Sequence, residues 1–420
     1  MGGLLLRNCS LVVKRRGIVE EEVDVLIEDG RIVAVDKGLG GGSDELDCRG
    51  LIVMPGLVNA HTHAAMWAFR GLFDRGELHE WLSAVWRVEP KLTWRLVYEA
   101  SRAAVAEMLM NGVTAFVDMY FHVDATLKAA EELGVRAYTG PTLVGGLDEG
   151  KIRRAEEELA SITRRATLGG AVVNVHAPYT SSVEVYREAA RLAERYGVLL
   201  STHVSETRDE VYEVKRRYGV FPVELLSRIG FLGPRSSLVH LGWVTSWELE
   251  EIRRSGATVV HCPSSNMKLA TGGFLPLREM LDSGINVALG TDGPVSNNTL
   301  DMFREMRMAV LLARNNYWRT DVDAWGALEM ATVNGYRMIG LKGGVVEPGA
   351  AADLALLNAS SPRLAPLTAR RAVSHIVYSA CGCDVAYTVV GGSVVYGPEK
   401  RGALVDTIRE AGAVLSEVFG

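Results

Sequence analysis

Two histidines separated by one residue end a hydrophobic run near the start of the chain. His61 and His63 follow the apolar segment that begins at Met54, and Thr62 lies between them. In an extended strand this spacing places both imidazoles on one face and Thr62 on the other. Two neutral imidazoles on one face can bind a single metal ion. An isolated pair is also compatible with two ordinary half-buried histidines, so the interpretation depends on the rest of the chain.

Further polar residues end later apolar runs. Most of the nine histidines lie at the ends of strand-like segments, whereas random placement would scatter them. The residues concerned, besides the first pair, are His176, His203, Glu206, His240, His261 and Asp292. If these strands are parallel neighbours, their carboxyl ends meet at one rim and the side chains surround a common site.

The alternation of strands and helices predicts the fold that would bring these residues together. Eight apolar runs are separated by amphipathic segments, several of them ended by Gly134, Gly197 or Gly256. This is typical of a (β/α)8 TIM barrel of about 280 residues, with its active site at the carboxyl ends of the strands. We expect the strands at 54–61, 113–119, 135–139, 171–175, 198–202, 237–240, 258–261 and 285–289.

Shorter β-rich runs flank the predicted barrel. They lie at 4–13, 23–28 and 31–35, with a hairpin turn at 28–31, and again at 349–357 and 384–396. We expect both ends of the chain to form one small, discontinuous, β-sandwich-like domain. The predicted boundaries are 1–55 and 346–420 for this small domain and 56–345 for the barrel.

Composition excludes several classes of protein. The net charge of −6 without a basic stripe argues against nucleic-acid binding. The short apolar runs at the amino terminus, interrupted by Arg7 and Asn8, fit neither a signal peptide nor a membrane-spanning helix, so we expect a cytoplasmic protein without a membrane partner. Five cysteines do not suit a disulfide framework, and we interpret Cys381 and Cys383 as ordinary small residues. The sequence leaves open whether the chain forms a homo-oligomer.

The strand-end motifs resemble the amidohydrolase superfamily, most closely its 5-methylthioadenosine/S-adenosylhomocysteine deaminase branch. The similarity covers nearly the whole chain, including the flanking small domain. The segments that carry it are His61–His63, Arg70-Gly71, Glu80–Leu82, Val117–His122, His203–Glu206, His240, His261–Leu269 and Thr291–Asn298. As a resemblance, it implies a metal-dependent hydrolytic deaminase that acts on an adenine nucleoside.

The resemblance assigns four residues to one divalent metal ion: His61, His63, His203 and Asp292. This shell leaves a position for water, as a catalytic zinc requires, and it does not exclude ferrous iron. The strand before His176 has no lysine at its end that could bridge a second metal, so we expect a single ion.

Three residues are expected to carry the chemistry. Asp292 can accept the proton of the attacking water, and His240 can orient that water by hydrogen bonding. The resemblance places Glu206 to protonate a ring nitrogen of the substrate and to carry a proton to the departing ammonia. The alternative interpretation of Glu206 is a helix-start residue without a catalytic role.

The substrate-binding residues implied by the resemblance are Trp81, Glu89, His176, His240 and Lys151. Glu89 would bind the ribose hydroxyls through charge-assisted hydrogen bonds. The alternative interpretation is a solvated glutamate at the start of a helix. Trp81 would form an apolar wall against the base or the sulfur substituent of the substrate. The alternative interpretation is that it packs in the core. His176 would contact the substrate, and otherwise it is a structural histidine.

Two classes of function remain open. The first is hydrolytic deamination of 5-methylthioadenosine, S-adenosylhomocysteine or adenosine, with guanine, cytosine or triazine-type aminohydrolases and chlorohydrolases as alternatives within the superfamily. The second is a non-catalytic barrel that uses the metal only for stability. Glu206 and His240 favour the enzyme, because a structural site needs neither an acid nor a water-orienting histidine.

The loop after the third strand departs from the family. Members that accept S-adenosylhomocysteine hold its carboxylate with arginines there, but 138–150 contains none, and Asp148 and Glu149 would repel a carboxylate. We therefore expect kcat/KM to be higher for 5-methylthioadenosine or adenosine than for S-adenosylhomocysteine. Lys151 or Arg153 could substitute as a point charge and reverse this preference.

Overall fold

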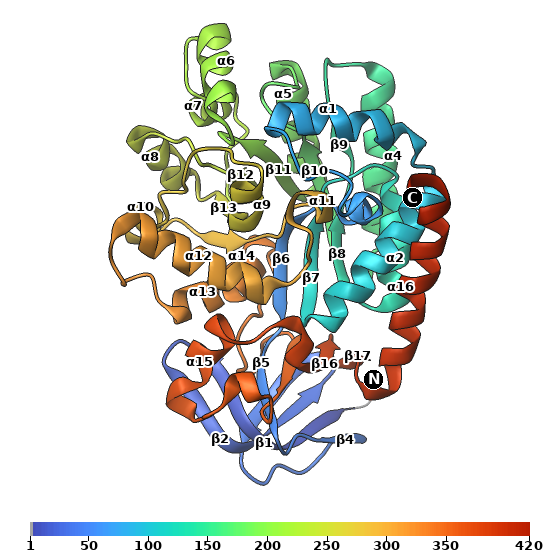
Figure 1. Cartoon of the computed structure of the whole chain (residues 1–420), viewed down its shortest axis with the longest axis vertical. Coiled ribbons are helices and arrows are strands. Elements are labelled where there is room, and N and C mark those ends of the chain that lie inside the picture. Colours follow the sequence, from blue (N-terminus) through green and yellow to red (C-terminus); the bar gives the residue numbers. More distant parts are fainter. Residues whose placement is uncertain (1–2) are drawn as a thin grey trace.

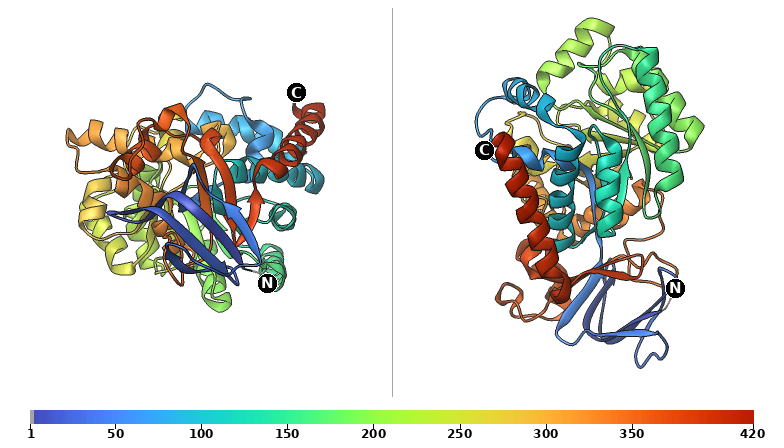
Figure 2. Two further views of the ribbon diagram at one scale, coloured as in Figure 1. Left: turned by 90° about the horizontal axis from the view of Figure 1, so that it is seen from below. Right: turned by 90° about the vertical axis from the view of Figure 1, so that its right-hand side faces the viewer.

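The computed structural model describes residues 3–420 and consists of a barrel and a smaller sheet stacked along the long axis of the molecule (Figure 1). The first strands of the chain lie in the small sheet. The last helix, α16 (Pro398–Phe419), runs from that sheet along the side of the barrel, as the right-hand view of Figure 2 shows.

Eight parallel strands form the barrel in chain order, with only the seam between the last and the first unpaired, which confirms the predicted (β/α)8 fold. They are β6 (Leu57–Thr62), β7 (Val113–Asp118), β8 (Arg136–Thr139), β10 (Gly170–Val175), β11 (Leu199–Val204), β12 (Ser236–His240), β13 (Thr258–His261) and β14 (Val287–Leu289). A short extra strand, β9 (Thr142–Leu143), pairs with β10. Most residues of these strands are buried, as expected for parallel strands that are covered on both faces.

Helices surround the barrel. They are α1 (Leu78–Val88), α2 (Trp94–Met110), α3 (Val123–Leu133), α4 (Glu149–Arg165), α5 (Val183–Tyr196), α6 (Arg208–Tyr218), α7 (Pro222–Arg228), α8 (Ser246–Ser255), α9 (Pro263–Lys268), α10 (Leu277–Asp282), α11 (Pro294–Asn297), α12 (Met302–Tyr317), α13 (Ala324–Ala331) and α14 (Val333–Met338). The predicted glycine ends of α3, α5 and α8 are confirmed, since Gly134, Gly197 and Gly256 adopt left-handed backbone. The helices α13 and α14 are separated at Thr332, whose φ of −129° and ψ of −99° interrupt the helical backbone.

The seam between β14 and β6 is closed by the residues that follow β14. The Asn59 amide donates to the Thr291 hydroxyl at 2.7 Å and accepts from the Thr291 backbone N–H at 2.9 Å. The Asp292 N–H donates to the carbonyl of His61 at 3.0 Å. Gly290 permits this approach, because a Cβ there would lie 2.8 Å from the same carbonyl. The seam therefore places Asp292 beside the first two histidines.

The small sheet contains strands from both ends of the chain. Its order is β17-β16-β15-β5-β1-β2-β3, with β4 paired to β1. The bounds are β1 (Leu4–Arg15), β2 (Ile18–Glu28), β3 (Arg31–Asp36), β4 (Asp44–Asp47), β5 (Leu51–Pro55), β15 (Leu354–Asn358), β16 (Val385–Val390) and β17 (Ser393–Tyr396). Antiparallel pairing of β5 with β15 joins the two segments, and the sheet has a hydrophobic core of its own. We propose that residues 1–55 and 346–420 form the small domain and that residues 56–345 form the barrel domain.

The small domain also contributes helices that the sequence analysis did not predict. The segment 346–420 includes α15 (Ala369–Tyr378) and the 22-residue α16 besides its strands. Because α16 packs against α2 of the barrel, the carboxyl-terminal segment contacts the barrel and also contributes strands to the small sheet.

A buried ion pair joins the small sheet to the amino-terminal end of the barrel. The Arg136 guanidinium donates to both carboxylate oxygens of Asp353, at 2.7 and 3.0 Å. The Tyr336 hydroxyl and the Gly391 N–H donate to the same carboxylate at 2.8 and 2.7 Å. Each oxygen of Asp353 therefore has two donors. We call these residues the basal cluster.

The interpretation of Cys381 and Cys383 as ordinary small residues is wrong. The two side chains form a disulfide across a short 3-10 turn, in which their Cα atoms lie 5.3 Å apart. The intervening Gly382 is required by close packing, since a Cβ there would lie 1.7 Å from the side chain of Asn111. Cys9, Cys48 and Cys262 are free and buried.

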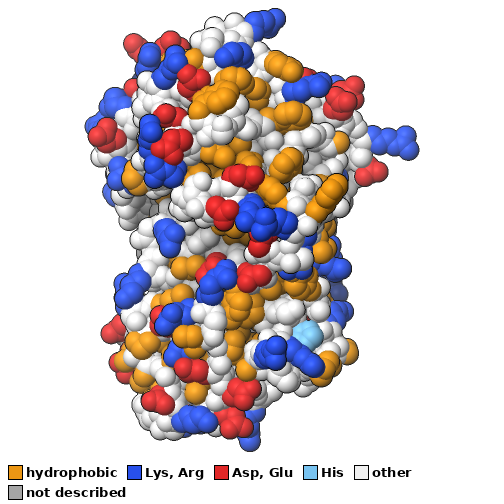
Figure 3. All heavy atoms as spheres, turned by 90° about the vertical axis from the view of Figure 1, so that its left-hand side faces the viewer, with side chains coloured by type: hydrophobic (Ala, Val, Ile, Leu, Met, Phe, Trp, Pro, Cys, Tyr) orange, Lys and Arg blue, Asp and Glu red, His pale blue; other side chains and the backbone are white. Residues whose placement is uncertain are grey.

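The surface agrees with the charge pattern of the sequence. On the face that carries α8 and α10, acidic and basic side chains are interspersed and no basic stripe is visible (Figure 3). Within residues 3–420, no helix is long and apolar enough to cross a membrane.

Candidate active site

A cavity of about 570 Å³ opens at the carboxyl ends of the barrel strands. It brings together nine of the ten predicted site residues, and His61 lies directly against two of them. The nine that line it are His63, Trp81, Glu89, Lys151, His176, His203, Glu206, His240 and Asp292. His261 also ends a strand, but it is buried and does not line the cavity.

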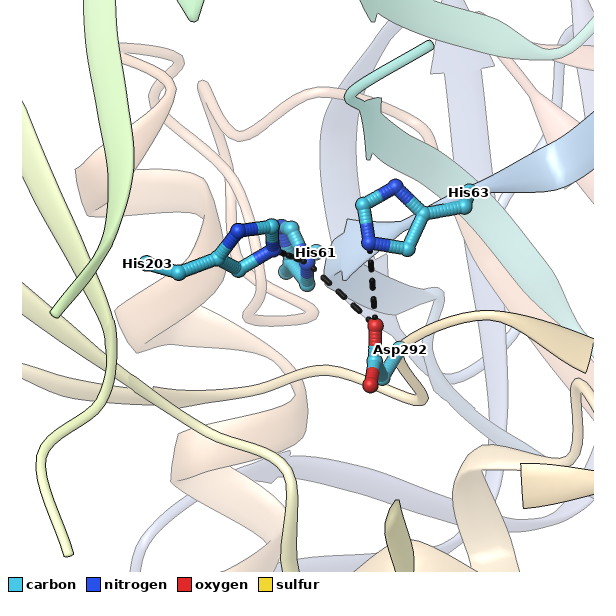
Figure 4. A group of neighbouring side chains, drawn as sticks. All are labelled: His61, His63, His203 and Asp292. Carbon is cyan, nitrogen blue, oxygen red and sulfur yellow. Dashed lines mark hydrogen bonds and ion pairs between the residues drawn. The ribbon is translucent and has the colours of Figure 1, made fainter. Parts of the chain in front are cut away.

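The four predicted metal ligands converge on one point (Figure 4). His61 and His63 come from β6, His203 from β11, and Asp292 follows β14. The nearest distances are 3.0 Å between His61 Nε2 and His203 Nε2, and 3.1 and 3.5 Å from Asp292 Oδ1 to the Nε2 atoms of His63 and His61. Ligand atoms of a tetrahedral zinc site lie about 3.3 Å apart when each bond is about 2.0 Å. The donor set and its spacing therefore fit a divalent metal ion.

Hydrogen bonds fix which ring nitrogen His63 and His203 present to the metal position. His63 Nδ1 lies 2.5 Å from the Met119 carbonyl, and His203 Nδ1 lies 2.8 Å from the His176 carbonyl. A carbonyl only accepts, so each Nδ1 carries the proton and each Nε2 keeps its lone pair toward the centre. Burial lowers the pKa of His61 to about 4 and that of His203 well below its usual range, which keeps both rings neutral.

Two serines orient the carboxylate of Asp292. The Ser265 and Ser296 hydroxyls donate to Oδ2 at 2.5 and 2.9 Å, which leaves Oδ1 facing the histidines. Burial favours protonation of this carboxyl group, but the neighbouring His61 and His63 side chains outweigh that effect and hold the pKa of Asp292 well below its usual range. The carboxylate is therefore ionised and directed at the metal position.

Glu206 and His240 form a second pair beside the metal ligands. His240 Nε2 lies 3.7 Å from Glu206 Oε1, and its Nδ1 lies 2.8 Å from the amide oxygen of Asn266. Both side chains are buried and line the cavity. Burial raises the pKa of Glu206, so this carboxyl group holds a proton nearer to neutral pH than an exposed glutamate does.

The predicted substrate-binding residues lie on helices and loops around the cavity. Trp81 is on α1, and its buried indole N–H has no partner in the described part of the chain. Glu89 follows α1 and accepts a hydrogen bond of 2.8 Å from the Tyr120 hydroxyl. His176 follows β10, and its Nδ1 lies 2.7 Å from the Thr180 hydroxyl oxygen. The cavity therefore extends from the metal ligands to the inner side of α1.

Lys151 is on α4 and is already hydrogen-bonded. Its ammonium group donates to the carbonyls of Val144 at 3.0 Å and Gly146 at 3.3 Å. It therefore secures the loop between β9 and α4 while lining the cavity. Arg154 and Glu158, further along the same helix, line the cavity as well.

The sequence analysis missed the residues that support or extend the site. Ser265, Asn266 and Ser296 lie inside motifs that it noted, but no spacing indicated which atoms they would contact. Arg154 and Glu158 had a weak signal, since residues four apart share one face of a helix. Tyr120 and Tyr179 line the cavity from loops, for which periodicity gives no signal.

Comparisons with known proteins agree with this geometry. Residues 52–395 match the model of the Amidohydrolase family. The chain is 40% identical over 403 residues to a 5-methylthioadenosine/S-adenosylhomocysteine deaminase of Thermococcus onnurineus, covering 93% of each chain. It is 40% identical to a 5'-deoxyadenosine deaminase of Methanothermobacter thermautotrophicus, covering 88% of each chain. A zinc-bound adenosine deaminase from Xanthomonas campestris superposes with a TM-score of 0.92 at 31% identity, covering 99% of this chain and 98% of the other.

Proposed function

Because this chain belongs to the amidohydrolase family, we propose that it is a metal-dependent deaminase that hydrolyses the exocyclic C–N bond of an adenine nucleoside. Water and the nucleoside are the reactants, and ammonia and the corresponding inosine analogue are the products. Two proteins that are 40% identical to this chain are named as deaminases of adenine nucleosides.

The observation that carries the proposal is the position of Glu206 and His240 beside the four converging ligands in one cavity. A site that used metal only for stability would close its shell with protein ligands and would need neither group. The buried acid and the neighbouring histidine favour an enzyme over the non-catalytic alternative.

The metal centre takes one divalent ion, and we propose that this ion is zinc. Three imidazole nitrogens and one carboxylate oxygen suit zinc, although they do not exclude ferrous iron. Such an ion supplies the Lewis acidity that makes water nucleophilic at neutral pH. The strand β10 ends at Val175 and is followed by His176, with no lysine at this point, so we propose a single ion.

The protein groups then have separate tasks. Asp292 accepts a proton from the attacking water, and two serine hydroxyls hold its carboxylate in place. His240 Nε2 orients that water. Glu206 donates a proton to the ring nitrogen next to the carbon under attack, and later carries a proton to the leaving amino group, which departs as ammonia.

The remaining residues hold the nucleoside. Glu89 would accept hydrogen bonds from the ribose hydroxyls through the carboxylate oxygen that Tyr120 leaves free. Trp81 would pack against the base or the sulfur substituent. The His176 ring would contact the substrate, while its carbonyl oxygen fixes the tautomer of His203.

We further propose that substrates with an uncharged 5′ substituent, such as 5-methylthioadenosine, are preferred over S-adenosylhomocysteine. The ammonium group of Lys151 is already bonded to two carbonyls, and breaking those bonds would offset its attraction for a carboxylate. Arg154 lines the same part of the cavity and is the cation through which the opposite preference would arise. The cytoplasmic location stays a prediction.

A substrate panel tests the proposed function. Ammonia release is measured with adenosine, 5-methylthioadenosine, 5'-deoxyadenosine, S-adenosylhomocysteine, guanine, cytosine and an aminotriazine, and metal content is determined on the same preparation. We expect the adenine nucleosides to give the highest kcat/KM. A clear preference for guanine, cytosine or the triazine would contradict the proposal.

A further inference from the structure

Glu210 is a buried carboxylate next to the site that the proposed chemistry does not use. It lies in the first turn of α6 and is 1% exposed. Among the described residues, no lysine or arginine pairs with it. Instead, Oε1 accepts the backbone N–H of Ser205 at 2.7 Å and Oε2 accepts that of Glu206 at 2.9 Å. Both oxygens are therefore bonded to the segment that connects β11 to α6.

This arrangement departs from an ordinary helix cap. Thr207 caps α6 and accepts the N–H of Glu210, so the spacing from Thr207 to Glu210 is that of a capping box. In a capping box the glutamate bonds the N–H of the cap residue itself. Here Glu210 reaches past Thr207 to the two preceding residues. It therefore holds the loop rather than completing the helix end.

The loop that it holds has an unfavourable backbone conformation. Ser205 has a φ of 53°, in the left-handed region that costs roughly 1–2 kcal/mol for a residue with a side chain. This turn directs the chain after the metal ligand His203 so that the next side chain, Glu206, enters the cavity. The Glu210 carboxylate accepts hydrogen bonds from two successive N–H groups, and these bonds stabilise the turn.

Helix stability alone does not account for a carboxylate at this position. Burial raises the pKa of Glu210 to about 8, which reflects the cost of holding the charged form there. Asp209, exposed in the same turn, already places negative charge near the helix amino terminus. A buried group retained at such a cost is typical of sites where geometry serves function.

We propose that Glu210 is a positioning residue, which fixes the main chain of Glu206 so that its carboxyl group meets the substrate ring. This inference rests on the proposed role of Glu206 in proton transfer. Because Glu210 bonds only to main-chain atoms of the loop, the Glu206 carboxyl group stays free to exchange protons.

Three variants of α6 test the proposal in the metal-loaded enzyme. Glu210→Ala removes both acceptors, and we expect kcat to fall on the order of 10²-fold, the effect of misplacing a catalytic group by about 1 Å. KM and metal content should change little, because the residues that bind substrate and metal keep their own contacts. Asp209→Asn, in the same turn, is the matched control and should keep wild-type kcat.

Glu210→Gln decides the question if the alanine variant does not fold. It keeps one acceptor but turns an amide N–H₂ toward the other N–H, so kcat should fall about 10-fold. A folded Glu210 variant with wild-type kcat and only a lower Tm would show a merely structural role and overturn the proposal. A parallel loss of metal would overturn it too.

Glu206→Gln separates this inference from the proposed function. If Glu206→Gln loses rate while both Glu210 variants keep it, only the positioning role fails. If Glu206→Gln keeps the wild-type rate, the assignment of Glu206 fails and the positioning role fails with it.

Discussion

The two ends of the barrel both contain a buried polar cluster, but the clusters differ in how their charges are matched. In the basal cluster, the Asp353 carboxylate faces the Arg136 guanidinium and has two donors for each oxygen. At the opposite end, Asp292 and Glu206 face imidazoles and hydroxyls, and no lysine or arginine of residues 3–420 pairs with them.

This difference separates stability from function. A buried ion pair with all its hydrogen bonds satisfied is complete and joins the two parts of the chain. Buried carboxylates without a cation cost free energy. Such carboxylates are typical of sites where a bound metal ion or substrate supplies the missing partner. In barrels of this kind, these sites lie at the carboxyl ends of the strands.

The largest effect is expected from removing a metal ligand. Asp292→Asn or His61→Ala should lose metal, activity or both, because each residue supplies one of the four ligand atoms that converge on the metal position. Metal content and ammonia release are measured on the same preparation. Wild-type turnover by a metal-free variant would show that the polar cluster at the carboxyl ends of the strands is not a metal-dependent site.

Loss of the acid should be the next largest effect. Glu206→Gln keeps the size of the side chain but cannot exchange a proton, so turnover should fall by a factor of about 10² to 10⁴ while the metal stays bound. The measurement is kcat together with metal content. Unchanged turnover would refute the assignment of Glu206.

The basal cluster should give the opposite result. Arg136→Met leaves Asp353 buried without its cation, and we expect a loss of about 3–5 kcal/mol in the free energy of unfolding. Activity at temperatures well below the Tm should match the wild type, because this cluster is at the other end of the barrel. Denaturant unfolding and kcat are measured together. A fall in kcat with unchanged stability would show that the basal cluster serves activity and not stability.

The strand ends could be predicted from the sequence because a parallel barrel places them on one rim. The spacing of His61 and His63, with the later residues His203, Glu206 and Asp292, was therefore sufficient to predict the cavity. The basal cluster could not be predicted, since Arg136 and Asp353 are 217 residues apart and meet only when the small sheet docks.

The contacts that α4 makes at the site could not be predicted from the sequence pattern. The role of Lys151 depends on where the carbonyls of Val144 and Gly146 lie, which is set by the loop conformation. Arg154 and Glu158 belong to a helix whose placement over the cavity depends on packing. The amphipathic spacing of α4 predicts a buried face, but not that this face borders a substrate.

The smallest effect concerns the mouth of the cavity. We expect kcat/KM for 5-methylthioadenosine to exceed that for S-adenosylhomocysteine by about 10-fold, which corresponds to roughly 1.4 kcal/mol for an unpaired carboxylate. Steady-state kinetics with both substrates measure this ratio. A preference for S-adenosylhomocysteine that falls in Arg154→Ala or in Lys151→Ala would contradict the prediction and identify the cation responsible.

Metal reconstitution tests the central claim most directly. The chelated enzyme is titrated with zinc while ammonia and the inosine analogue formed from 5-methylthioadenosine are both quantified. We predict that the rate rises in proportion to bound zinc up to one ion per chain, and that the two products appear in equal amounts. A rate that does not depend on zinc, or turnover without ammonia, would contradict the account.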